Sequence, residues 1–138
     1  ILLKALSVAP ASTITISITD NREPVELTTE HEFNITVVAN VAPTFTNLDN
    51  LASSMSINDE SYEFDIDHSD LDENQVTYQL RVDTYLSTQL SWVSLDPTTG
   101  LLEIIPTQNN IGSHELVFTI SDGCLSTEEE KSFTILGN

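Results

Sequence analysis

Basic side chains are the scarcest charged group in this sequence. Lys and Arg together number 4, whereas Asp and Glu number 22, which gives a formal net charge of −18 over 138 residues. A surface with this charge repels nucleic acid and anionic lipid. We therefore predict that the segment binds no nucleic acid and makes no contact with a membrane.

Cysteine and long apolar runs are also nearly absent. The single cysteine, Cys124, cannot form a disulfide within the chain, which leaves a free thiol or a bridge to a neighbouring module or chain. No run of about eighteen apolar residues occurs, so we predict no membrane-spanning helix within the segment. Whether a membrane-spanning helix lies outside the segment is a question that this sequence leaves open.

The motifs of common enzyme classes are missing. There are four glycines in all, and the sequence has no Gly-x-Ser-x-Gly, no phosphate-binding glycine-rich loop and no His-Glu-x-x-His. The histidines His31, His68 and His114 show no recurring metal-ligand spacing. We predict that the segment is not an enzyme.

What the sequence does contain is alternation of apolar and polar residues. Tyr62, Phe64 and Ile66 share one face and acidic residues take the other, as in a half-buried antiparallel strand. The same pattern returns in three further stretches, Val76–Val82, Leu116–Ile120 and Phe133–Ile135. No stretch has a sustained helical period. The chain is therefore predicted to be all-β.

Turn signals divide these strands at short intervals. Pro97-Thr98-Thr99-Gly100 precedes the apolar run Leu101–Ile105, and Pro106 follows it. About seven short strands with frequent turns are typical of a Greek-key β-sandwich of the immunoglobulin type. Trp92, the largest apolar residue, is expected to fill the core between the sheets, in preference to serving as a platform for a bound sugar.

One pattern occurs twice, because Ile16–Asp20 followed by Phe33–Val37 is echoed by Phe118–Asp122 followed by Phe133–Ile135. Such repetition indicates a tandem array. A β-sandwich needs about 100 residues. We therefore expect residues 41–138 to form one complete repeat and residues 1–40 to be the C-terminal part of a preceding repeat. The chain is then an excerpt of a longer protein.

Acidic residues gather in the stretch from His68 to Asn74. Its Asp-x-Asp-x-Asn spacing places the side-chain oxygens of Asp70, Asp72 and Asn74 on one side of a tight loop. Ca²⁺ takes six to eight oxygen ligands, several of them carboxylates. Asp122 ends a strand that would close the same edge of the sandwich, and Asn40 lies at the junction of the repeats. The alternative is that these residues only turn the loop.

Several motifs resemble the cadherin repeat. They are Ala42-Pro43-Thr44-Phe45, Asp70-Leu71-Asp72 with Asn74, Thr99-Gly100-Leu101-Leu102, and Ile120-Ser121-Asp122-Gly123. The resemblance covers residues 41–138, and the tail of a previous copy runs to Asn40. Within that superfamily the sequence from Leu90 to Gly112 is similar to dystroglycan-type cadherin-like repeats and immunoglobulin-like (Ig-like) repeats. The implied fold is a cadherin-like β-sandwich in a tandem array.

The resemblance implies a calcium site at the junction with the preceding repeat, where the ion would stiffen the array. Asp70, Asp72 and Asp122 would be ligands, Asn74 and Asn40 would contribute oxygens, and Glu60 would serve the following junction. Two motifs depart from the cadherin pattern. The linker Val38-Ala39-Asn40-Val41 has no carboxylate, and Pro106–Asn110 replaces the expected Asp-Arg-Glu. At most one ion per junction is then expected.

Two functional classes remain. The favoured one is an extracellular structural or adhesion repeat of a larger surface or filament protein, with neighbouring repeats of the same chain and a homophilic or heterophilic protein as partners. The other is a ligand-binding accessory module of the Ig-like type, for carbohydrate or protein. Asn34-Ile35-Thr36 is an N-glycosylation sequon, which fits an extracellular or cell-surface location.

Overall fold

The computed structural model describes residues 12–20, 27–35 and 38–137. The chain forms two compact units, residues 1–39 and residues 40–138. The division falls beside the boundary expected between residues 40 and 41, although the assignment of the first unit to a preceding repeat stays a prediction. Within the described ranges, no helix is long and apolar enough to cross a membrane.

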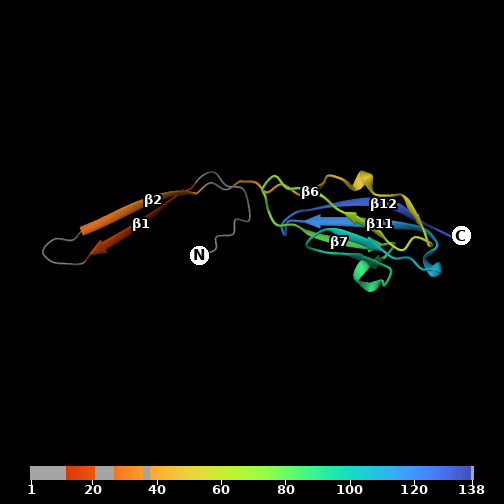
Figure 1. The fold of residues 1–138 in the computed structure, drawn as a ribbon. Coiled ribbons are helices and arrows are strands. Elements are labelled where there is room, and N and C mark those ends of the chain that lie inside the picture. The colour runs from red at the N-terminus through yellow and green to blue at the C-terminus, as the bar shows by residue number, and fades with distance from the viewer. Residues whose placement is uncertain (1–11, 21–26, 36–37, 138) are drawn as a thin grey trace. The chain divides into compact units, whose positions relative to one another are not determined.

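The first unit contains a β-hairpin. Strands β1 (Ser12–Asp20) and β2 (Leu27–Ile35) pair antiparallel, with Ile16 opposite His31 (Figure 1). Side chains of directly paired residues share a face, and alternate residues of a strand share a face, so Ile16 and Ile18 lie on the same face as His31 and Phe33. Ile16, Ile18 and Phe33 are exposed within this unit. The turn expected between the strands and residues 36–37 lie outside the described residues.

The second unit is a two-layer sandwich with a smaller pair of strands beside it. The larger sheet has the order β4 (Ser54–Ser56), β12 (Ser126–Leu136), β11 (Gly112–Ser121), β7 (Thr77–Val82) and β8 (Tyr85–Leu86). The second sheet has the order β5 (Tyr62–Asp65), β10 (Leu101–Ile104) and β9 (Val93–Leu95). A two-stranded pair joins β3 (Thr44–Phe45) to β6 (His68–Ser69). Three short 3₁₀ turns complete the unit, η1 (Leu48–Asn50), η2 (Ser87–Gln89) and η3 (Gln108–Asn110).

The chain crosses between the two sheets several times, as the predicted Greek-key sandwich requires. It passes from β5 to β7, returns to β9 and β10, and crosses again to β11 and β12. The described residues 40–137 contain seven strands of three or more residues, in agreement with the predicted number. Most neighbours pair antiparallel, whereas β4 runs parallel to β12.

The core lies between the two sheets, and its residues are those of the alternating pattern. Trp92 is 9% exposed and belongs to this core, as expected from the sequence. The other buried apolar side chains of the strands that face it are Met55, Val93, Leu102, Ile104, Tyr78, Leu80, Val82, Leu116, Phe118, Ile120, Phe133 and Ile135.

The predicted turn before β10 is present and has a clear cause. The Asp96 carboxylate accepts hydrogen bonds from the backbone N–H groups of Thr98 and Thr99, each at 2.8 Å. These bonds, that of Thr99 first, lower the pKa of Asp96. Gly100 then takes a φ of +79°, and a Cβ at this position would lie 2.9 Å from the Ile66 carbonyl oxygen. Only glycine fits such a place without strain.

The first residues of the second unit and the end of its last strand lie far apart. Asn40 lies against the turn that connects β11 to β12, because its side chain bonds to Asp122. Strand β12 then runs the length of the sheet, and Leu136 at its far end pairs with Ser56 of β4 (Figure 1). The two ends of the unit therefore lie at opposite ends of the sandwich.

Candidate junction site at the start of the second unit

Asn40 joins two segments that are distant in the sequence. Its Nδ2 donates a hydrogen bond to Asp122 Oδ2 at 2.7 Å. Its Oδ1 accepts a hydrogen bond from Asn74 Nδ2 at 3.1 Å. The carboxamide of Asn40 thus bridges the β11–β12 turn and the loop that follows β6.

Val41, the residue after Asn40, is also held by the second unit. Its backbone N–H donates to Asp72 Oδ2 at 2.6 Å. Asp72 in turn donates its backbone N–H to Asp70 Oδ1 at 2.7 Å, which closes a turn of the loop. Glu73, the next residue, has a φ of +55°. Asn40 and Val41 are therefore held by three side chains of the second unit, those of Asp72, Asn74 and Asp122.

Asp122 is held by the turn that it begins. Its Oδ1 accepts the backbone N–H groups of Cys124 and Leu125, both at 2.7 Å. The N–H of Leu125, then the side chain of Asn40 and the N–H of Cys124, lower the pKa of Asp122. Cys124 in this turn is exposed and free.

Asp70 Oδ2 is the exception in the cluster. It is buried and has no hydrogen-bond partner, unlike the other buried side-chain nitrogen and oxygen atoms of the described residues. A cation would satisfy this oxygen. However, the described part of the chain holds no group of three or more His, Cys, Asp or Glu residues close enough to bind a metal. The donor set therefore does not fit a calcium centre built from several carboxylates.

The other predicted site residues lie elsewhere. Glu60 is exposed in the connection between β4 and β5, beside the far end of β12, where Ile57 N–H donates to the Leu136 carbonyl. It is therefore at the opposite end of the unit from Asp122. Asn34 lies on β2 in the first unit and is exposed. Within the second unit the structure thus brings together Asn40, Asp70, Asp72, Asn74 and Asp122, and Glu60 lies apart from them.

Two residues of the second unit, Val41 and His114, make contacts that the sequence did not indicate. The Val41 N–H is a backbone group, so residue type does not mark it. His114 donates from Nδ1 to Asp83 Oδ2 at 2.9 Å and from Nε2 to the Asn110 carbonyl at 2.8 Å. The His114 ring also packs on Trp92, with ring centroids 4.9 Å apart. Pairing of β7 with β11, which a single sequence does not display, brings Asp83 beside His114.

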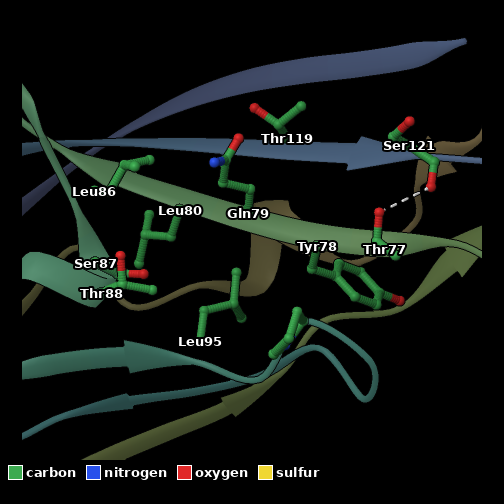
Figure 2. A pocket seen from close by; sticks show the side chains of 11 residues that line it. Thr77, Tyr78, Gln79, Leu80, Leu86, Ser87, Thr88, Leu95, Thr119 and Ser121 are labelled. Atoms are coloured by element: carbon green, nitrogen blue, oxygen red, sulfur yellow. Dashed lines mark hydrogen bonds between the residues drawn. The ribbon is translucent and has the colours of Figure 1, made fainter. Parts of the chain in front are cut away.

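A groove of about 390 Å³ lies along β7 (Figure 2). Leu80, Leu86, Leu95 and Tyr78 supply apolar surface, and the remaining side chains are mostly hydroxyl-bearing. The full lining is Thr77, Tyr78, Gln79, Leu80, Leu86, Ser87, Thr88, Leu95, Pro97, Thr119 and Ser121. None of these residues is charged, although the chain carries 22 acidic residues.

Comparison with solved structures places the fold in a known class. A crystal structure of human protocadherin-24 EC1-2 is 18% identical with a TM-score of 0.51, over 70% of this chain and 45% of that one. Drosophila N-cadherin EC1-4 is 12% identical with a TM-score of 0.52, over 96% of this chain and 34% of that one. An endo-fucoidan hydrolase of glycoside hydrolase family 107 is 17% identical with a TM-score of 0.48, over 91% and 19%.

The fold is a cadherin-like β-sandwich, as the resemblance of the sequence implied. At these identities the similarity concerns the fold alone, and the chain spans less than half the length of the cadherin structures that it matches. No family model and no curated protein matches the sequence.

Proposed function

We propose that this chain is part of an extracellular structural or adhesion protein built from repeated modules in series. The observation that carries the proposal is the position of the two ends of the second unit. The chain comes in beside Asp122 and leaves at the far end of β12. Modules with this geometry join end to end without any change in their fold. The cadherin-like fold supports the same assignment by analogy.

Small-angle X-ray scattering tests the serial arrangement. The sample is the full chain followed by a second copy of residues 40–138, compared with the chain alone. The maximum dimension should rise by about 36 Å, the length of the eleven residues of β12 at about 3.3 Å per residue. A rise of much less would mean that the modules pack side by side, which contradicts the proposal.

The β1–β2 hairpin supports the second part of this proposal, that residues 1–40 end a preceding repeat. Its alternating isoleucines are the counterparts of the buried residues of β11, yet Ile16 and Ile18 are exposed. A sheet equivalent to β5, β10 and β9 would cover them.

Glycosylation of Asn34 would fit the extracellular location, because Asn34 lies in the exposed part of β2. Loss of a glycosidase-sensitive mass shift in Asn34→Gln, after expression in a secretory host, tests this site.

The groove along β7 favours the alternative, a ligand-binding accessory module. Its volume falls in the range of small-molecule sites, about 300–1,000 Å³. An uncharged lining with hydroxyl groups suits a neutral carbohydrate. NMR titration with neutral oligosaccharides should shift signals of the groove residues in the wild type and not in Leu86→Asp. Tyr85→Asp is the control, because Tyr85 is exposed next to the groove without lining it. Unshifted wild-type signals would remove the alternative.

A further inference from the structure

We propose that Asn40 and Val41 form a hydrogen-bonded latch that holds the junction segment on the second unit without a cation. The latch comprises the Asn40 carboxamide, the Val41 N–H, and their partners Asp122, Asn74 and Asp72. The resemblance to cadherin repeats implied that calcium would hold this segment. The inference rests on the proposed serial function only in calling the segment a junction, because every latch contact lies within residues 40–138.

Most carboxylate oxygens of the cluster accept hydrogen bonds from N–H donors. Asp70, Asp72 and Asp122 have six carboxylate oxygens, and four of them accept hydrogen bonds from N–H groups of this unit. Lys131, the lysine of the described residues, contacts Asp49 and Glu129 instead. Hydrogen bonds to an ionised acceptor are stronger than those between neutral groups. The N–H groups therefore supply the positive partial charge that a cation would bring.

The latch and a cation would compete for the same oxygens. Ca²⁺ bound at Asp122 Oδ2 and Asp72 Oδ2 would compete for their lone pairs with Asn40 Nδ2, at 2.7 Å, and Val41 N, at 2.6 Å. The Asn40 oxygen is occupied as well, since it accepts from Asn74. A calcium ion needs six to eight oxygens, so its binding would open the latch. The two carboxylate oxygens outside these four, Asp70 Oδ2 and Asp72 Oδ1, are too few to complete such a coordination shell.

The residue at position 40 decides which of the two states is available. A carboxylate in place of the Asn40 carboxamide would lose the Nδ2–H donor and face Asp122 with a like charge, which costs stability. It would also add the carboxylate that the linker lacks. We therefore expect Asn40→Asp to convert a cation-independent junction into a calcium-dependent one.

Thermal melting of the full 138-residue chain in 2 mM EDTA and in millimolar CaCl₂ provides the test, because a ligand of the folded state raises the melting temperature. The wild type should melt at the same temperature in both. Asn40→Asp should melt lower than the wild type in EDTA, by about 4 °C or more, and recover in calcium. Asn109→Asp is the control, because it adds the same charge at an exposed residue of η3 away from the latch.

Amide hydrogen exchange measures the latch directly. In Asn40→Ala the Val41 N–H should exchange faster than in the wild type, while amides of the β11–β12 pairing keep their protection. A saturable rise of the wild-type melting temperature with calcium would overturn the inference. Unchanged Val41 exchange in Asn40→Ala would overturn it too, even if the serial arrangement of modules measured by scattering holds.

Discussion

The β1–β2 and β11–β12 hairpins have the same pattern in sequence but differ in their surroundings. Ile16 and Ile18 of β1 are 51% and 71% exposed, whereas their counterparts Phe118 and Ile120 of β11 are 0% exposed. The difference lies in the second sheet, which covers the apolar face of β11 and β12 and has no counterpart in the described part of the first unit. Alternation thus specifies a strand and its two faces, while burial depends on a partner sheet.

The largest effect is expected from one change made in both hairpins. Phe133→Ala removes a ring that is 0% exposed in the core and should lower the free energy of unfolding by about 3–5 kcal/mol. Phe33→Ala removes an exposed ring and should change the free energy of unfolding of the second unit by less than about 0.5 kcal/mol. Urea denaturation followed by Trp92 fluorescence measures both. Equal losses would contradict the assignment of the core to residues 40–138.

The second sheet itself can be weakened at the turn before β10. Gly100→Ala places a Cβ against the Ile66 carbonyl at a φ of +79°, so a loss of about 1–3 kcal/mol is expected. Gly123→Ala shares a positive φ of +88° but meets no atom within 4 Å. Comparison of the two in the same urea assay separates steric contact from backbone strain. Gly123→Ala should be the milder change.

The His114 contacts predict a smaller effect, which depends on pH. Burial of the ring lowers the pKa of His114, but the hydrogen bond to Asp83, the Asn110 carbonyl and the Asp83 charge outweigh it and leave the pKa raised. The stabilisation is therefore complete below the ordinary histidine pKa of about 6.5 and is lost as the pH rises through the folded-state value.

Melting temperature between pH 5.5 and 8.5 measures this loss. Burial raises the pKa of Asp83, yet the bonds from His114 and the Glu115 N–H leave it lowered. Asp83 therefore stays ionised across this interval. The fall in wild-type melting temperature with rising pH should flatten in His114→Gln. His31→Gln, which changes a histidine of the first unit, should keep the wild-type slope. An identical slope in His114→Gln would show that other groups cause the dependence.

The smallest effect on stability is expected on the exposed face of the first hairpin. Ile16→Lys with Ile18→Lys should leave the melting of the second unit unchanged and reduce the fluorescence of an apolar dye bound to the chain. Ser17→Lys with Thr19→Lys carries the same added charge on the polar face of β1. Equal dye binding in both double variants would mean that this face is already covered.

Much of the fold followed from residue pattern. Tyr78, Leu80 and Phe118 were predicted to face the core because apolar residues recur at every second position, and all three are buried. The pairing of β4 with β12 was not predicted. A three-residue parallel edge strand shows too little alternation to be recognised, and register between distant strands depends on tertiary packing.

The residues that form the junction site could be predicted from the sequence, whereas the hydrogen bonds that hold them together could not. Asp70, Asp72, Asn74, Asp122 and Asn40 were expected together from loop spacing and strand ends, and they do meet. Which oxygens are already occupied depends on backbone N–H groups such as that of Val41. Every residue except proline has such a group, so the sequence does not mark it.

The parallel pairing of β4 with β12 has a mechanical consequence. In a chain pulled from both ends, β4 is drawn toward its N-terminus and β12 toward its C-terminus. Because these strands run in the same direction, the pull acts along their hydrogen-bonded rungs from Ser54–Thr134 to Ser56–Leu136 and loads them together in shear. Tension then meets a group of bonds that must break at once, whereas a hairpin pulled open at its ends yields one bond at a time.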